Sequence, residues 1–212
     1  DTTSLFSAVV HGRSKAVVAL LEAKADPHLV RPSKDRARWT QLHYAAEKGK
    51  VEIVEALLQH GANPDAQTGY SPQSPQFPGS PQNRSDLTGV TPLYLATLNN
   101  QADSVKLLLA HKADPNLPAK DTATPLIRAI WNRNVPIATM LLDHGADVNV
   151  RGDWNGMTPL HFAVQFTSLD LVEAILAHQP DMNAMDNNGA TALDYARGKA
   201  ELTEIAALLR KH

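Results

Sequence analysis

Residues 158–163 read Thr-Pro-Leu-His-Phe-Ala, and close variants of this stretch recur along the chain. Thr is a favoured N-cap, and Pro suits the first helical position because its missing N–H needs no partner there. Each copy therefore predicts the start of a helix. Three of the five spacings between copies lie within one residue of 33, and the copies begin at Thr3, Thr40, Thr91, Thr124, Thr158 and Thr191.

A second marker keeps the same register. An Asp or Asn follows each of the first five Thr residues by 23 positions, at Asp26, Asn63, Asp114, Asp147 and Asp181. The second half of each unit carries an apolar stripe at helical spacing, such as Val105, Leu108 and Leu109. A single unit cannot bury such a stripe alone, so neighbouring units must stack.

The pattern resembles the ankyrin repeat, whose signature is Thr-Pro-Leu-His-x-Ala in a unit of about 33 residues. The resemblance implies an all-α solenoid of six helix-turn-helix units with β-turn or hairpin tips, forming one array over residues 1–212. The expected repeats cover about 1–34, 35–66, 86–118, 119–152, 153–185 and 186–212. The first repeat lacks a recognisable turn and the last ends in a polar Arg-Lys-His, so we expect both array ends to be present.

The turn between the two helices of a unit also has a pattern. Residues that tolerate left-handed backbone angles end the early first helices: Gly12, Gly49 and Asn100. Arg133, Thr167 and Ala200 take that place later, so we expect those turns to be less regular. The spacing Asp186-x-x-Gly189 predicts a tight turn just before the last repeat.

Composition narrows the function. The chain has no Cys, which excludes disulfides and thiolate metal sites, and it has no apolar run long enough to cross a membrane. Its net charge of −2 argues against nucleic acid as the main partner. Residues 1–60 carry a balance of +2 and residues 141–206 one of −7, a dipole that orients charged partners. We expect a monomeric array in the cytoplasm or nucleus.

Two insertions interrupt the register. Residues 30–38 carry four basic side chains and one acidic, which fits either a solvated loop or a contact for an acidic partner. Residues 67–85 hold a Pro at every third position from Pro72 to Pro81, the period of a polyproline II helix. Ser71, Ser74 and Ser80 each precede a Pro and are candidate phosphorylation sites. The alternative is a tolerated surface loop.

No catalytic or metal motif stands out, so we predict no catalytic residues, no metal and no cofactor. Four histidines lie 20 residues after their Thr, at His60, His111, His144 and His178. Adjacent repeats lie about 8–10 Å apart, too far for two such rings to share a zinc ion. We expect them to stabilise helix C-termini. The family resemblance implies that His43 and His161 are scaffold residues that hydrogen-bond across the repeat.

In ankyrin repeats, partners contact the turn tips and the exposed ends of the first helices on a concave face. Transferring those positions by register gives candidates that include all three tryptophans: Arg36, Trp39, Lys48, Leu87, Val90, Leu98, Trp131, Trp154, Met157, Gln165 and Phe166. Trp and Arg are enriched at interface hot spots. The alternative is that each Trp covers its own turn.

The sequence therefore predicts a non-catalytic protein–protein interaction module that recognises a protein partner. The alternative is a regulatory or targeting domain of a larger enzyme or channel.

Overall fold

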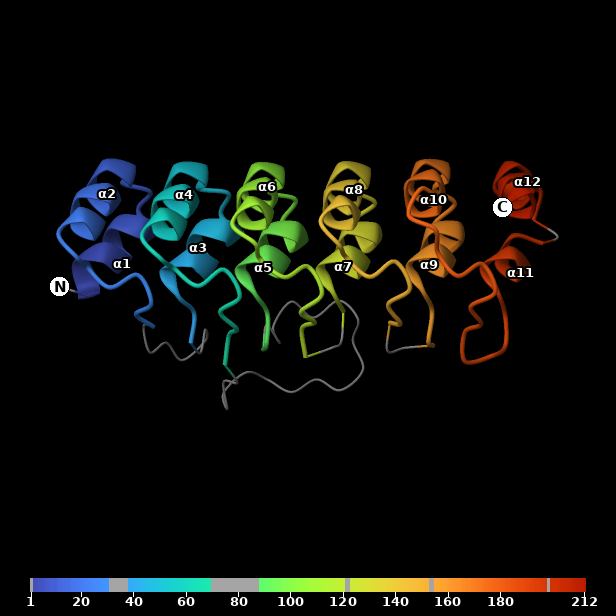
Figure 1. Ribbon diagram of the computed structural model, residues 1–212, viewed down its shortest axis with the longest axis horizontal. Helices are drawn as coiled ribbons and strands as arrows, with labels where there is room; N and C mark the ends of the chain where they lie inside the picture. The colour runs from blue at the N-terminus through green and yellow to red at the C-terminus, as the bar shows by residue number, and fades with distance from the viewer. Residues whose placement is uncertain (1, 31–37, 70–87, 121–122, 153–154, 198) are drawn as a thin grey trace. The chain divides into compact units, whose positions relative to one another are not determined.

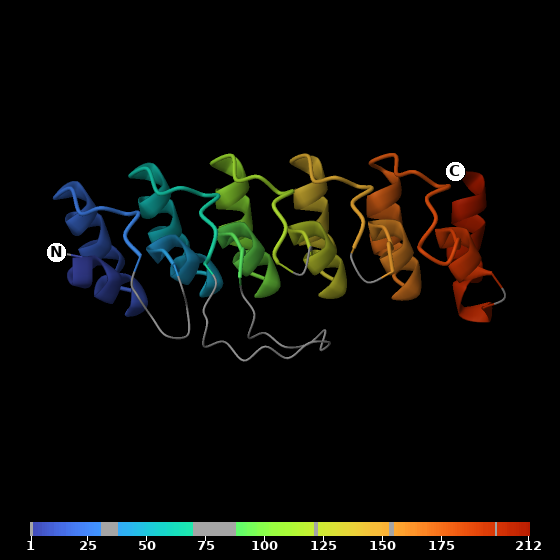
Figure 2. The ribbon, with the colours of Figure 1, turned by 90° about the horizontal axis from the view of Figure 1, so that it is seen from below.

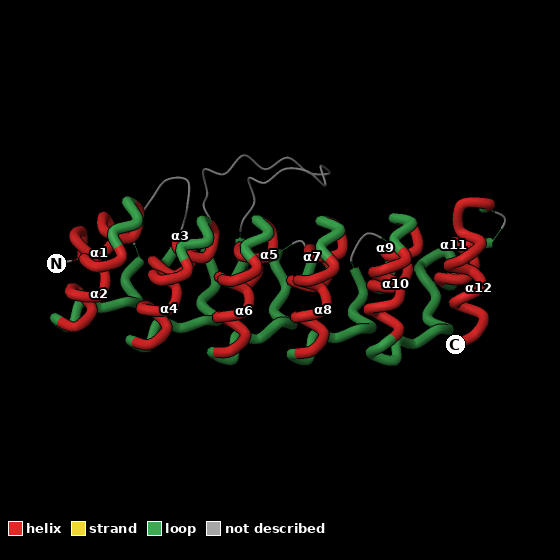
Figure 3. The backbone as a smooth tube through the Cα atoms, turned by 90° about the horizontal axis from the view of Figure 1, so that it is seen from above, coloured by secondary structure: helices red, strands yellow, loops and turns green. Residues whose placement is uncertain are grey.

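The structure is a computed structural model that describes residues 2–30, 38–69, 88–120, 123–152, 155–197 and 199–212. These residues form helices, turns and two isolated antiparallel bridges, with no strand among them. Figure 3 shows the helices and the loops that join them. The chain divides into two compact units, Asp1–Lys120 and Asp121–His212. The predicted all-helical fold is confirmed, whereas one continuous array of six repeats stays a prediction.

The described residues of the first unit form three consecutive helix pairs. Their helices are α1 (Thr2–Val10), α2 (Ser14–Glu22), α3 (Gln41–Glu47), α4 (Val51–Gln59), α5 (Pro92–Leu98) and α6 (Ala102–Ala110). The first helices α1, α3 and α5 pack side by side in one layer, and the second helices α2, α4 and α6 pack in another (Figure 1). The described parts of the loops between these helix pairs project away from the second helices (Figure 1).

The second unit repeats this plan in its described residues. Its elements are α7 (Pro125–Trp131), α8 (Val135–Asp143), α9 (Pro159–Gln165), α10 (Leu169–Leu176), α11 (Ala192–Ala196), the 3₁₀-helix η1 (Ala200–Leu202) and α12 (Thr203–Lys211). Each first helix contacts the next first helix, and each second helix contacts the next second helix. Figure 2 shows each pair of this unit beside its neighbour.

Five of the first helices, α3, α5, α7, α9 and α11, begin directly after the repeated Thr, as predicted, whereas the prediction is wrong for Thr3, which lies inside α1. Thr40, Thr91 and Thr124 have extended backbone angles, and each side chain accepts the N–H of the third residue of its helix. Pro92 and Pro125 occupy the first turn of their helices, as predicted. These caps satisfy N–H groups that a helix start otherwise leaves without a partner, and each is typically worth about 1 kcal/mol.

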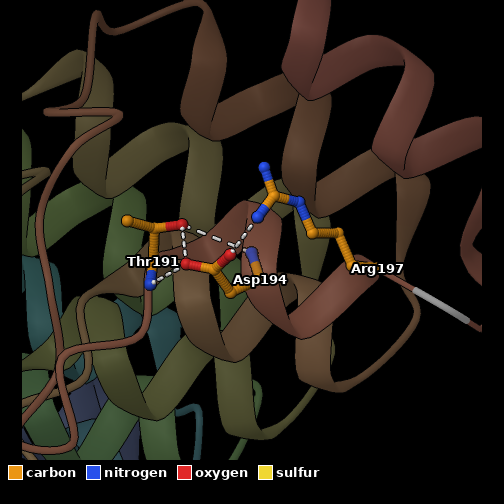
Figure 4. Close-up of polar contacts among 3 residues, drawn as sticks. All are labelled: Thr191, Asp194 and Arg197. Carbon is orange, nitrogen blue, oxygen red and sulfur yellow. Dashed lines mark hydrogen bonds and ion pairs between the residues drawn. The ribbon is translucent and has the colours of Figure 1, made fainter.

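The last helix pair has the most complete cap (Figure 4). The Asp194 carboxylate accepts the backbone N–H of Thr191 at 2.9 Å and its hydroxyl at 2.7 Å. Arg197 donates to the other carboxylate oxygen at 2.8 Å. The Thr191 bonds, followed by the charge of Arg197, hold the pKa of Asp194 below its ordinary value. The carboxylate therefore serves to start α11.

Two of the later turns are as regular as the early ones, so that sequence prediction is wrong. Arg133 and Thr167 have φ angles of 54° and 56°, close to the 57° of Asn100. Arg133 N donates to Ile130 O at 2.9 Å, and Asn134 N donates to Ala129 O at 3.0 Å. These bonds outweigh the cost of about 1–2 kcal/mol that a side chain adds in this conformation. The turn at Ala200 does differ, because Ala200 begins η1.

The tight turn predicted at Asp186 is confirmed. Gly189 N donates to Asp186 O at 3.1 Å, and Gly189 has a φ of 78°, which favours glycine. The Asp186 carboxylate accepts from the Tyr195 hydroxyl at 2.7 Å and from the Ala190 N–H at 2.9 Å. These bonds, the Tyr195 bond first, hold the pKa of Asp186 below its ordinary value. The acidic side chain is thus part of the turn.

Candidate functional site

The predicted partner surface is only partly described. Arg36, Leu87 and Trp154 lie outside the described residues, and so do the candidate phosphorylation sites Ser71, Ser74 and Ser80. The remaining predicted positions divide into two classes. Those immediately before the N-cap Thr are buried, whereas those at the C-terminal ends of the first helices reach the surface.

Trp39, Val90 and Met157 do not offer a binding surface, so their assignment to it is wrong. They are 2%, 1% and 5% exposed. Each directly precedes an N-cap, a position whose apolar side chain packs against the fourth residue of the helix. The Trp39 ring meets the ring of Tyr44 edge-on, with centroids 5.0 Å apart. A large apolar side chain at this position is therefore core.

In the first unit, the accessible side chains at the ends of the first helices include Lys48, Leu98 and Val10. Lys48 is exposed and forms an ion pair with Glu47 at 3.5 Å. Leu98, at the end of α5, is half-buried. Val10, at the end of α1, is 43% exposed, although it was not among the predicted partner-binding positions. The same register would have found it, because Val10 follows Thr3 by seven residues as Leu98 follows Thr91.

In the second unit the predicted residues come together. Trp131 at the end of α7 and Phe166 just after α9 are both half-buried, and Gln165 is exposed beside them. Phe162 of α9 links the two rings. Its ring lies 5.8 Å from that of Trp131 in an edge-to-face arrangement and 6.4 Å from that of Phe166 in a stacked one. Three aromatic rings thus join two neighbouring repeats.

Two arginines that sequence reasoning missed complete this group. The guanidinium of Arg128 lies over the Trp131 ring, 4.7 Å from its centroid, and that of Arg133 lies 5.5 Å from the centroid of Phe166. Both distances fall within the range of cation–π attraction. We call the group the α7–α9 aromatic surface, and its members are Arg128, Trp131, Arg133, Phe162, Gln165 and Phe166.

Two buried histidines are scaffold residues, as the family resemblance implied. His43 Nε2 donates to Val90 O at 3.1 Å, and His161 Nε2 donates to Ala190 O at 3.0 Å. The other nitrogen of His43 accepts the N–H of Thr40 at 3.1 Å. Burial is the main cause that lowers the pKa of His43 to about 4. Each ring therefore ties a helix start to the loop before the next repeat.

Three of the four regularly spaced histidines end second helices, as predicted, whereas His178 lies one residue beyond Ala177, the C-cap of α10. His60, His111 and His144 are the C-cap residues of α4, α6 and α8. The Nδ1 atom of His60 donates to Ala56 O at 2.8 Å, and that of His144 donates to Met140 O at 2.8 Å. His178 Nε2 lies 3.4 Å from a carboxylate oxygen of Asp143. The bonds of His60 and His144 satisfy carbonyl groups at helix ends, whereas His178 contacts a side chain.

The described part of the chain contains neither a metal-binding group nor a membrane-spanning helix. Its His, Asp and Glu side chains form no group of three or more that could hold a metal ion. Its helices include none that is long and apolar enough to cross a membrane.

Comparison with known proteins agrees with the helical repeats. A family model described as ankyrin repeats matches in three copies, over residues 1–68, 76–152 and 150–212. Mouse inversin is 28% identical over 97% of this chain. The human transient receptor potential cation channel subfamily A member 1 is 30% identical over 80% of it. Palmitoyltransferase AKR1 of Lachancea kluyveri is 27% identical over 81% of it.

The matched region is a small part of each relative. The chain spans 18% of the length of inversin, 14% of the channel and 22% of the palmitoyltransferase. What these proteins share with the chain is therefore the repeat region. Because the family model covers nearly all of residues 1–212, the chain belongs to the ankyrin-repeat family.

Proposed function

We propose that this chain is a non-catalytic module that binds a protein partner on the face formed by the ends of its first helices. The observation that carries the proposal is the α7–α9 aromatic surface. Trp131 and Phe166 remain half-buried although each contacts another ring, so a partner can still bury part of both. Partly exposed Trp beside Arg is the composition of interface hot spots.

The location of this group also supports the proposal. The rings of Trp131 and Phe166 lie at helix ends, whereas the cores of the helix pairs are filled by buried side chains such as Leu141 and Ile175. Solvent-exposed aromatic surface costs free energy that a partner would recover on binding, at about 25 cal/mol per Å² of apolar area. The α7–α9 aromatic surface is therefore a better anchor than the polar side chains around it.

The proposal can be tested by affinity purification with the whole chain as bait, followed by calorimetry with the partner obtained. Replacing Trp131 and Phe166 together with Ala should weaken binding by more than about tenfold. The Gln165→Tyr variant adds bulk to the same surface and removes no core contact, so it should also weaken binding. Val18→Ala, on the exposed side of α2, is the control and should change little. Equal affinity of wild type and both surface variants, with circular dichroism unchanged, would reject the proposal.

A second candidate function is regulation or targeting of a larger enzyme or channel. The observation in its favour is that the matched regions of a channel and of a palmitoyltransferase are only 14% and 22% of those proteins. The parent protein would then lose its regulation or its location when residues 1–212 are removed. Unchanged activity and location after that deletion would exclude this candidate.

A further inference from the structure

We propose that the α7–α9 aromatic surface binds an uncharged, proline-rich segment of its partner. The proline rings of that segment contact Trp131 and Phe166, and its backbone carbonyls accept hydrogen bonds from Arg133 and Gln165. This inference rests on the proposed function and adds the chemistry of the partner. Three observations carry it: the opposing charges at and around the surface, the hydrogen-bond donors beside the rings, and the fixed position of the rings.

The charges at and around the surface favour a ligand without charge. Helices α7 and α9 carry no acidic residue, and the Arg133 guanidinium lies 5.5 Å from the centroid of the Phe166 ring. A basic segment would therefore meet like charge at the rings. Residues 141–206 carry a charge balance of −7, and Asp170, just after Phe166 in the sequence, is exposed. The surrounding chain therefore repels an acidic segment, whereas an uncharged segment avoids both costs.

The exposed polar side chains beside the rings are richer in hydrogen-bond donors than in acceptors. The Arg133 guanidinium carries only donors, and the Gln165 amide carries both donors and an acceptor. Both side chains belong to exposed residues. Arg128 is half-buried and already lies over the Trp131 ring, so we assign it no contact with the ligand. The complementary ligand therefore offers acceptors, and in an uncharged segment these are carbonyl oxygens.

A proline-rich segment meets this requirement better than a helix or a strand does. A helix uses its backbone carbonyls in its own hydrogen bonds. A strand binds by pairing its N–H and carbonyl groups with a sheet edge, and the described residues contain no strand. A polyproline II helix has no internal hydrogen bonds, so its carbonyls are free, and each proline lacks an N–H. Domains that recognise such segments do so with aromatic side chains.

The rings are held in place before a ligand arrives. Phe162 is 8% exposed, and its ring centroid lies 5.8 Å from that of Trp131 and 6.4 Å from that of Phe166. Rings fixed in this way lose little freedom on binding. A polyproline II helix is also preformed, so it loses less freedom than a flexible segment would. The fixed rings and the preformed ligand therefore suit each other.

The test is a selection against the whole chain from a random peptide library displayed on phage. Peptides of about 12 residues allow about four turns of a polyproline II helix. Selected peptides should carry two or more Pro at intervals of three positions and few Asp, Glu, Lys or Arg. Synthetic copies are then measured by fluorescence anisotropy beside copies in which Ala replaces each Pro. We expect the Pro peptides to bind about fivefold or more tightly, because the Ala copies lose the ring contacts and the preformed conformation.

Variants of the chain identify the site. Trp131→Ala should lower the affinity of the Pro peptides more than about tenfold. Gln165→Glu keeps the shape of the side chain and removes its N–H donors, and Arg133→Met removes the guanidinium donors, so each should lower the affinity about fivefold. The matched controls are Gln59→Glu on α4 and Arg210→Met on α12, both at exposed positions, and each should change the affinity less than about twofold.

Salt distinguishes this ligand from a charged one. Raising the salt from about 50 to about 500 mM should change the affinity of the Pro peptides less than about twofold, because screening acts on contacts between charges. A charged peptide on the same surface would respond more strongly.

Several results would overturn the inference. These are selection of charged peptides, selection of uncharged peptides without proline, recovery of no peptide, a loss of more than about twofold in affinity at the higher salt, and unchanged affinity in either donor variant. Uncharged peptides without proline that lose affinity on Trp131→Ala would leave the proposed function standing. Binding that survives every variant of this surface would remove both.

Discussion

His43 should make the stability of the first unit depend on pH. Its ring is fully buried, with Nε2 donating to Val90 O and Nδ1 accepting the N–H of Thr40. A proton on Nδ1 would face that N–H donor, so the site holds the neutral ring. Burial accordingly lowers the pKa from 6.5 to about 4. The unfolded chain therefore binds this proton more tightly than the folded chain does. We expect acid to lower the stability of the first unit for this reason.

The magnitude follows from the two pKa values. Above pH 6.5 the ring is neutral in both states, and its contribution to stability is fully present. Between pH 6.5 and about 4 the unfolded chain binds a proton that the folded chain refuses, so the free energy of unfolding falls as the pH falls. A difference of one pKa unit is worth about 1.4 kcal/mol, so the loss between pH 7 and pH 4.5 is roughly 2.5 kcal/mol.

Urea unfolding followed by circular dichroism at several pH values measures this loss. The matched variant is His43→Gln, which keeps an amide donor near Val90 O and removes the titrating group. It should be less stable than wild type at pH 7, but its stability should fall less between pH 7 and pH 4.5, by roughly 2.5 kcal/mol. Asp186 and Asp194 have lowered pKa values and titrate below this window. If the free energies of unfolding of wild type and His43→Gln fell in parallel with pH, His43 would not be the cause of the pH dependence.

Three further predictions concern stability. Lys50 Nζ donates to Val9 O at 2.9 Å and to Val10 O at 2.7 Å. Lys50→Met should therefore speed hydrogen exchange in α1 and lower the free energy of unfolding by about 1–2 kcal/mol, and Lys106→Met is the control. Gln179 has a φ of 53° where Gly145 stands in another repeat, so in chemical denaturation Gln179→Gly should raise the free energy of unfolding by about 0.5–1 kcal/mol, whereas Gly145→Ala should lower it. Trp39→Ala should cost about 3–5 kcal/mol in chemical denaturation, more than Trp131→Ala, because Trp39 is core.

Much of the fold could be predicted because each local signal has a local physical cause. Thr91 and Thr124 each cap the helix that begins with the Pro-Leu pair after them. Such a cap is a local interaction and does not depend on distant parts of the chain. The turns at Arg133 and Thr167 were harder, since propensity alone disfavours those residues at positive φ. At these two turns the backbone hydrogen bonds of the repeat fix the φ angle, and the residue adopts that angle although its side chain disfavours it.

The proposed binding surface was less predictable because its geometry depends on contacts between repeats. Trp39 and Trp131 are the same residue type, and composition gives no reason to separate them. Arg128 and Arg133 reach the rings of Trp131 and Phe166 only through the folded geometry of two neighbouring helices. A single sequence shows a charged residue near a helix end and gives no sign of which ring it will cover.

The number of residues between each tryptophan and the N-cap Thr of its helix nevertheless distinguishes Trp39 from Trp131, once the structure shows where each position lies. One residue before the cap, a side chain packs against the first turn of its own helix, as Trp39 does against Tyr44. Seven residues after the cap, a side chain stands at the helix end and reaches the next repeat, as Trp131 reaches Phe162. The first position therefore adds stability to one repeat, whereas the second brings rings from two neighbouring repeats together at the surface. Under the proposed function, the register of a bulky residue in these repeats decides whether it contributes to folding or to recognition, and its chemistry alone does not.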